Sequence, residues 1–208
     1  MAKNYPRPIV ETSHVEPGLA GWAHLVVDSL NSGLLGRASI FLGPHQSAKE
    51  SEALDVACVT GIVNCTNNFP NYHHQQSESS LSSSIEYCRV AVNDEFGANI
   101  LVYLDGATAF IQRHVCNGGS VLVHCQMGIS RSATVVIAYL MRFHGMGRDD
   151  AYRTVKSRRP SVEPNPGFWE QLRIYEARLR HDAPSAKEEI TSKFDKDWVE
   201  ISLATFQT

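Results

Sequence analysis

The short, continuous apolar run Ser120–His124 (SVLVH) places the strongest constraint on how this chain can fold. Such a run is typical of a strand that is buried on both faces, as happens when helices cover both sides of a parallel sheet. Other runs rich in apolar, aromatic or β-branched residues predict further strands. These runs are Ala38–Gly43, Gly61–Thr66 and Glu86–Val92.

Helices are predicted between and after these strands. Apolar residues at helical spacing predict an amphipathic helix from Ile100 to Val115. Ser47 is expected to cap an earlier helix over Ala48–Thr60, with Glu50 completing a capping box. Further helices are expected at Ser132–Phe143, Arg148–Ser157 and Gly167–His181. Strands that alternate with helices predict an α/β fold with a central, mostly parallel sheet flanked by helices.

The two ends of the chain carry less structural signal than its centre. Residues 1–36 lack clear periodicity, so we expect an N-terminal arm in which Gly21–Leu30 forms a short helix or a docking piece. Residues 37–181 are expected to form one domain, which contains a long polar loop at Asn67–Ser84. Residues 182–208 turn polar and are expected to form a C-terminal tail.

Composition limits the class of protein. The chain has 208 residues and a net charge of −3, which gives no general attraction to nucleic acid or to an anionic membrane. Its five cysteines show no disulfide or zinc spacing, and its first residues do not resemble a secretory signal. The longest apolar run, Ala133–Met141, is too short to cross a bilayer. We therefore expect a cytoplasmic protein, with the nucleus as a second location, that binds neither nucleic acid nor membrane.

The stretch Val121–Ser132 (VLVHCQMGISRS) carries the clearest chemistry. It runs from a predicted strand into a predicted helix, so backbone N–H groups and the positive end of the helix dipole would point at one spot. Gly128 allows the loop to curl where a side chain would clash. The planar guanidinium of Arg131 can bind two phosphate oxygens at once. We therefore expect a phosphate cradle with the sulfur of Cys125 at its base.

This environment should activate Cys125 as a nucleophile. A helix N-terminus and a nearby guanidinium lower the pKa of a cysteine, and the thiolate can then attack phosphorus near neutral pH. The Ser132 hydroxyl follows directly after Arg131 and is expected to hydrogen-bond the sulfur, which helps the thiolate to leave in a second step. We expect His124 to orient the loop through hydrogen bonds rather than to act as a base.

The leaving oxygen also needs a proton, which a carboxylic acid can supply before it activates water against the phosphocysteine. Asp94 follows the predicted strand Glu86–Val92, and sites of α/β sheets gather at the carboxyl ends of the strands. Glu95 is the adjacent alternative, and the chemistry of the sequence does not separate the two.

Several segments together resemble the dual-specificity phosphatases, a branch of the cysteine-dependent protein tyrosine phosphatases. HCQMGISRS resembles their signature loop, VAVNDEFGANI their acid-loop segment, and RRPSVEPNPGFWEQLRIYE their last core helix with the Pro-Asn turn before it. SIFLGPHQSAKESEALDVACVTGIVNCT resembles their opening strand–helix–strand, so the resemblance covers roughly residues 37–180. It favours Asp94 over Glu95, because the family's acid lies five residues before the Asn or Asp that opens the next helix, here Asn99.

The resemblance implies a small atypical member, without a rhodanese-like docking domain, that hydrolyses phosphotyrosine and phosphoserine or phosphothreonine through a phosphocysteine. It implies no metal and no other cofactor, a phosphoprotein substrate, and a protein kinase as one candidate partner. The implied catalytic residues are Cys125, Arg131, Asp94 and Ser132. The implied phosphate loop consists of Gln126, Met127, Gly128, Ile129, Ser130 and Arg131. His124 and Asn165 would support this loop.

Some alternatives stay open. The substrate could instead be a phosphoinositide, an RNA 5′-phosphate or a phosphoglucan, or the chain could be a phosphoprotein-binding module with weak activity. Cys65 or Cys88 could form a reversible disulfide with Cys125, as in some family members, or could simply be a small buried residue. Arg158 and Arg159 could bind a second phosphate or an acidic substrate flank, or form an ordinary solvated helix end.

Overall fold

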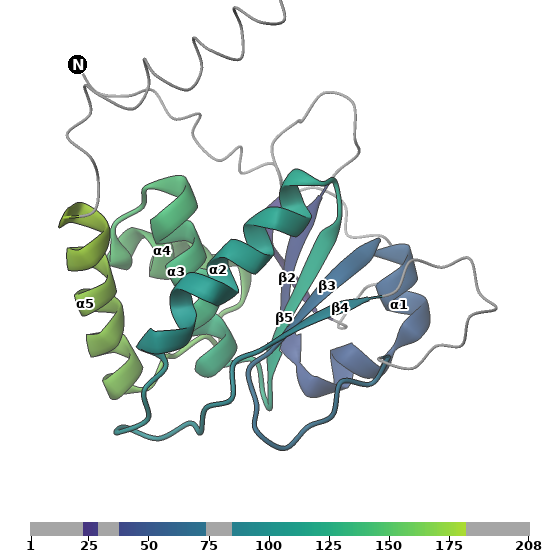
Figure 1. The fold of residues 1–208 in the computed structure, drawn as a ribbon, viewed down its shortest axis with the longest axis horizontal. Helices are drawn as coiled ribbons and strands as arrows, with labels where there is room; N and C mark the ends of the chain where they lie inside the picture. Colours follow the sequence, from purple (N-terminus) through teal and green to yellow (C-terminus); the bar gives the residue numbers. More distant parts are fainter. Residues whose placement is uncertain (1–22, 29–37, 74–84, 182–208) are drawn as a thin grey trace, which may run out of the picture.

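The computed structural model describes residues 23–28, 38–73 and 85–181, and these residues form a five-stranded sheet with helices on both faces (Figure 1). Its strands are β1 (His24–Asp28), β2 (Ser39–Pro44), β3 (Val59–Asn64), β4 (Glu86–Arg89) and β5 (Ser120–Cys125). They lie in the order β1-β2-β5-β3-β4. β1 pairs antiparallel with β2, and the other neighbours pair in parallel. The predicted α/β fold with a mostly parallel sheet is therefore confirmed.

The helices form two layers of unequal size. The 3-10 helix η2 (His45–Lys49) and α1 (Ser51–Val56) cover one face, where Phe41 and Leu122 join the smaller apolar core. The other face carries α2 (Leu101–Cys116), α3 (Arg131–His144), α4 (Arg148–Arg158) and α5 (Pro166–His181). Ile40, Leu42 and Val123 point into the larger core on that side, because successive side chains of a strand face opposite sides of the sheet.

β5 is the central strand, and all six of its residues are buried. This burial explains why its sequence is continuously apolar instead of alternating. The register pairs Pro44 of β2 with Cys125, and Asn64 of β3 with His124. The loops that follow β2, β3 and β5 therefore meet at one edge of the sheet, which is where ligand sites of such sheets occur.

The structure corrects two predictions for the first third of the chain. Within Gly21–Leu30 the short helix is wrong, because His24–Asp28 forms β1, which docks on the sheet by pairing antiparallel with β2. The helix predicted over Ala48–Thr60 is shorter, because Ser47 lies inside η2 and β3 begins at the β-branched Val59. No capping hydrogen bond from Glu50 precedes α1.

The remaining expectations for the ends of the chain and for one loop fall partly outside the described residues. These are the rest of the N-terminal arm, residues 74–84 of the predicted polar loop, and the tail 182–208. Within the described part, residues 67–73 contain neither helix nor strand, as expected for the start of that loop.

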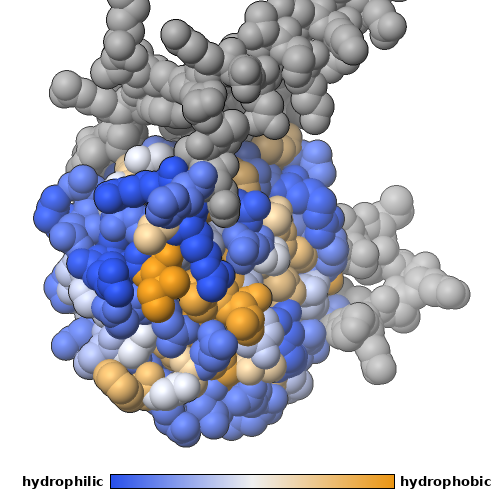
Figure 2. Space-filling view, turned by 60° about the vertical axis from the view of Figure 1, so that its left-hand side comes forward, coloured by the Kyte–Doolittle hydropathy of each residue, from blue (hydrophilic) through white to orange (hydrophobic). Residues whose placement is uncertain are grey.

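The face shown in Figure 2 is mainly hydrophilic, with hydrophobic areas between polar side chains. The larger apolar side chains that remain exposed are Val56, Phe96, Val102, Met127 and Ile174. In the part of the chain that the structure describes, no helix has both the length and the apolar character that a membrane span requires.

Candidate active site

Cys125 ends β5 at the base of the loop that leads into α3. Its side chain is buried, and its Sγ accepts hydrogen bonds from the Gly128 N–H and the Ser132 hydroxyl, both at 3.2 Å. Burial by itself raises the pKa of Cys125. Hydrogen bonds from Ser132 and from loop N–H groups, together with the charge of Arg131, outweigh this effect, so the pKa lies below its usual value. The loop thus favours a buried thiolate.

Two features of the loop require a glycine at position 128, the φ angle and the close approach of a neighbouring backbone. Its φ of +69° lies in the left-handed region, which glycine adopts without strain. A Cβ at this position would also lie 2.7 Å from the backbone carbon and oxygen of Gly43. The loop therefore rests directly on the backbone near the end of β2, and no other residue fits there without displacing one of the two segments.

Arg131 begins α3 and is almost fully buried beside Cys125. Its Nη1 donates to the carbonyl of Val92 at 3.3 Å, and its Nε lies 3.6 Å from Oδ2 of Asp94. Nε makes no hydrogen bond to any described residue. A buried guanidinium with an unused N–H is suited to donate to a phosphate oxygen.

Asp94, not Glu95, lies against the phosphate loop. Its Oδ1 accepts hydrogen bonds from the Ser130 hydroxyl at 2.6 Å and from Nδ2 of Asn165 at 2.8 Å. One third of its side chain remains exposed, so an incoming substrate can reach the carboxyl group. The exposed Glu95 side chain makes no hydrogen bond or ion pair with the described residues. The geometry therefore favours the same residue as the resemblance does.

Asn165 connects α5 to both loops. Its backbone N–H donates to the Ser130 hydroxyl at 3.0 Å, and its Oδ1 accepts from the N–H of Phe168 in the first turn of α5. One side chain thus caps a helix and holds the acid, which is more than the loop-bracing contact expected from the sequence.

His124 is fully buried next to the nucleophile. Burial, together with the charges of His45 and Arg89, lowers its pKa to about 4. The ring is therefore neutral near pH 7, and its Nδ1 donates to the carbonyl of Cys125 at 3.4 Å. A ring with so low a pKa is a weak base at neutral pH, which suits the orienting role expected for it.

Two residues that the sequence did not assign to the site hold its loops. Nε and Nη2 of Arg159 donate to the carbonyls of Gly128 at 2.8 Å and Met127 at 3.0 Å. Oε1 of Gln171 accepts hydrogen bonds from the N–H groups of Ile100 and Leu101, where α2 begins. Its Nε2 donates to the carbonyl of Ala98 at the end of the acid loop. Both side chains bond to backbone groups, which every residue has, so the sequence does not reveal these contacts. The only signal was the Arg158-Arg159 pair, which concerns Arg159 alone.

The remaining cysteines are free thiols, as is Cys125. Cys65 follows β3, and its N–H donates to the carbonyl of His124 at 2.8 Å, next to the strand end that carries Cys125. Burial raises the pKa of Cys65, and the nearby Cys125 and Cys88 raise it further. A reversible disulfide between Cys125 and either thiol stays a prediction.

Among the described side chains, no group of three or more His, Cys, Asp or Glu could hold a metal ion.

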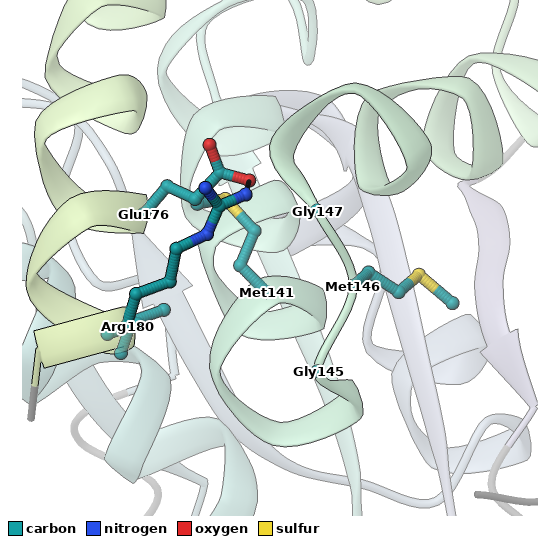
Figure 3. Close-up of a pocket in the computed structure, with 7 residues that line it drawn as sticks. Met141, Gly145, Met146, Gly147, Glu176 and Arg180 are labelled. Carbon is teal, nitrogen blue, oxygen red and sulfur yellow. Dashed lines mark hydrogen bonds and ion pairs between the residues drawn. The ribbon is translucent and has the colours of Figure 1, made fainter. Parts of the chain in front are cut away.

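A cavity of about 330 Å³ lies at the opposite end of α3 from Cys125 (Figure 3). An ion pair between Glu176 and Arg180, at 3.0 Å, lies at this cavity. Its lining residues are Met141, Gly145, Met146, Gly147, Glu176, Leu179 and Arg180. None of the residues predicted for the phosphate site lines it, so it is separate from the reaction centre.

Comparisons with known proteins agree with this geometry. Residues 40–178 match the family model described as "Dual specificity phosphatase, catalytic domain". The chain is 41% identical to human dual specificity protein phosphatase 14 over 142 residues, which cover 68% of each chain. It is 39% identical to human dual specificity phosphatase 28, covering 68% of this chain and 76% of that relative. A crystal structure of human DUSP28 aligns with a TM-score of 0.62 and 38% identity, over 68% of this chain and 90% of that one.

Proposed function

Because the chain belongs to the dual specificity phosphatase family, we propose that Cys125, Arg131 and Asp94 carry the reaction of that family. The reaction is the hydrolysis of phosphotyrosine and of phosphoserine or phosphothreonine on proteins through a phosphocysteine. The observation that carries the assignment is the buried Sγ of Cys125, which accepts two hydrogen bonds beside the guanidinium of Arg131.

In the first step, the Cys125 thiolate attacks phosphorus, so that a P–S bond forms while the P–O bond to the leaving group breaks. Arg131 and the N–H groups of the loop from Gln126 to Ser130 stabilise the charge on the phosphoryl oxygens. Asp94, in its protonated form, gives its proton to the leaving oxygen. The hydrogen bonds from Ser130 and Asn165 keep this carboxyl group at the mouth of the loop.

In the second step, the Asp94 carboxylate takes a proton from a water molecule, and the water oxygen attacks the phosphocysteine. The P–S bond breaks, and the electron pair returns to the sulfur. The Ser132 hydroxyl, 3.2 Å from Sγ, stabilises the thiolate as it leaves. Inorganic phosphate is released, and the enzyme returns to its starting state.

Two features support a protein substrate over the non-protein alternatives. The variable loop residues Gln126, Met127 and Ile129 include no lysine, which a strongly anionic lipid headgroup would favour. Met127, in this loop, and Phe96, near the acid, are 57% and 75% exposed and give the site an apolar rim that suits a peptide. The full set of nucleophile, clamp and acid argues against a module that only binds phosphoproteins.

We further propose that the catalytic domain covers residues 37–181, between an arm at 1–36 and a tail at 182–208, with β1 of the arm joining the sheet. The family match over 40–178 supports these limits. The five free thiols are compatible with a signalling role in the cytoplasm, with the nucleus as the alternative location. A phosphorylated protein kinase is one candidate substrate.

The test is Cys125→Ser, with Cys58→Ser as a matched control at an exposed thiol. We expect Cys125→Ser to retain the circular dichroism spectrum, to lose turnover of p-nitrophenyl phosphate and phosphopeptides, and to bind phosphopeptides that the wild type releases. Cys58→Ser should remain active. Normal turnover by Cys125→Ser would refute the mechanism, and faster release from phosphoinositides than from phosphopeptides would refute the protein substrate.

A further inference from the structure

Arg159 bonds to two peptide units of the phosphate loop whose N–H groups interact with the sulfur of Cys125. Arg159 follows directly after α4 and bonds to the carbonyls of Gly128 and Met127, which lie 31 and 32 positions earlier in the chain. The carbonyl of Met127 shares its peptide unit with the N–H of Gly128, which donates to Sγ of Cys125 at 3.2 Å. The carbonyl of Gly128 likewise shares its peptide unit with the N–H of Ile129.

A peptide unit is planar, and its C=O and N–H point in opposite directions. When Arg159 holds these two carbonyls away from Cys125, it turns the N–H groups of Gly128 and Ile129 toward the sulfur. Hydrogen bonding from Ile129 is also one of the effects that lower the pKa of Cys125. The two N–H groups held in this way belong to the loop that would receive phosphate oxygens.

The charge of Arg159 acts on the same centre. Partial burial lowers the pKa of its guanidinium, and the nearby thiolate of Cys125 opposes this effect, as expected of a negative charge close to a positive one. Two of the five N–H groups of Arg159, on Nε and Nη2, are bonded to loop carbonyls, so this edge of the planar fork serves the phosphate loop.

Strand β1 supports the backbone from which Arg159 extends. Nδ1 of His24 donates to the carbonyl of Arg158 at 2.7 Å. The neighbouring Ala23 packs near Gly43, whose backbone lies under Gly128. β1 precedes residue 40, where the match to the family model begins, so this support comes from outside the matched domain.

We propose that Arg159 is a positioning residue of the phosphate loop, which orients the Gly128 and Ile129 N–H groups, and that His24 holds Arg159 in place. This inference rests on the proposed role of Cys125 as nucleophile. This role differs from those that the sequence left open, which were a second phosphate site, a site for an acidic substrate flank, or a solvated helix end.

The test compares Arg159→Ala and Arg159→Lys with Arg158→Ala, which removes the same charge one position earlier. Three quantities are measured on the full chain: the pH dependence of Cys125 alkylation by iodoacetamide, the inhibition constant of tungstate, and kcat/KM for an aryl phosphate. Alkylation needs no turnover, so it separates a failure of this inference from a failure of the proposed reaction. Thermal unfolding and circular dichroism report whether each variant is folded.

For Arg159→Ala we expect alkylation to shift to higher pH, weaker tungstate inhibition, and a loss in kcat/KM of about 10- to 100-fold. Arg159→Lys should recover only part of the lost reactivity, tungstate binding and kcat/KM, because an ammonium keeps the charge but not the planar fork. Arg158→Ala should stay within about twofold of the wild type, as expected for a side chain without contacts to the loop. If Arg159→Ala fails to fold, the comparison is decided by Arg159→Lys and Arg159→Gln.

A folded Arg159→Ala with unchanged alkylation profile and tungstate inhibition would overturn the proposal, and so would full recovery by Arg159→Lys. His24→Ala tests the support from β1. It should produce a smaller shift in the same direction, and His24→Ala combined with Arg159→Ala should be no worse than Arg159→Ala alone. Additive losses in this double-mutant cycle would contradict the role of His24.

Discussion

The hydroxyl of Ser130 donates a 2.6 Å hydrogen bond to the carboxylate of Asp94, which joins the phosphate loop directly to the acid loop. Asn165 donates to the same oxygen from the turn before α5. The loop that carries the proposed nucleophile and the loop that carries the proposed acid are therefore held together by side-chain hydrogen bonds, which single substitutions can remove one at a time.

Asp94→Asn should slow the reaction most for substrates with poor leaving groups, because these depend most on proton donation. We expect a loss in kcat of about 100-fold or more for phosphoserine peptides and a smaller loss for p-nitrophenyl phosphate. The basic limb of the pH profile should flatten. Glu95→Gln is the control and should resemble the wild type. A larger loss in Glu95→Gln than in Asp94→Asn would move the role to Glu95.

Ser132→Ala removes a hydrogen bond that lowers the pKa of Cys125. The pKa of Cys125 should rise, so less thiolate is present at a given acidic pH, and the acidic limb of kcat/KM moves to higher pH. The second step should also slow by about 10-fold or more, because the leaving thiolate loses a charge-assisted bond. Rapid-quench measurements should then detect accumulated phosphocysteine. An acidic limb at the wild-type pH, in a folded variant, would be inconsistent with this role.

Gly128→Ala should be both less stable and inactive, because a Cβ at φ +69° is strained and would meet the backbone of Gly43. We expect the free energy of unfolding to fall by about 2 kcal/mol or more, measured by urea denaturation. Gly106→Ala is the matched control, since Gly106 lies inside α2 with open space around it. It should raise the free energy of unfolding by about 0.5–1 kcal/mol and leave kcat unchanged. Equal effects of the two substitutions would contradict the packing described for the loop.

His124 should make the stability of the protein depend on pH. Its pKa is about 4 in the folded state and near 6.5 in the unfolded state, so the unfolded chain binds the extra proton first. The contribution of His124 to the free energy of unfolding is complete above about pH 6.5. It is lost as the pH falls toward about 4, by up to about 3 kcal/mol.

His124→Gln removes this titration while keeping a polar side chain. Urea denaturation of variant and wild type at pH 7 and at pH 4.5 gives the measurement. The stability difference between the two proteins should become smaller at the lower pH, because the wild type alone loses the contribution of His124. A difference that does not change with pH would show that His124 is not the titrating group.

The phosphate loop could be predicted from the sequence because its parts are local. Cys125, Gly128, Arg131 and Ser132 lie within one strand–loop–helix turn, so their spacing alone fixes which groups face one another. β5 was predictable for a similar reason, since burial on both faces leaves a continuous apolar run. Asp94 needed the resemblance, because Glu95 has the same chemistry and only the fold turns one of them toward Ser130.

Most of the errors and omissions have one physical origin, which is that they concern backbone partners distant in sequence. β1 forms because the edge of β2 offers unpaired backbone groups, and pairing of this kind leaves little pattern in five residues. Arg159 and Gln171 bond to carbonyls and N–H groups of other loops, which carry no side-chain signature. The capping box at Ser47 failed for a local reason, because Ser47 lies inside η2 and no side-chain cap precedes α1.

Arg159, Asn165 and Gln171 all follow Cys125 in the chain, yet they hold loops made earlier. During translation the nucleophile, the clamp and the acid are therefore synthesised before the residues that fix their positions. A nascent chain that ends before Asn165 carries Cys125 and Ser130 but lacks the side chain that donates the second hydrogen bond to Asp94. Full dephosphorylating activity should thus appear only after Asn165 and α5 have left the ribosome, so the order of synthesis limits the activity of an incomplete chain.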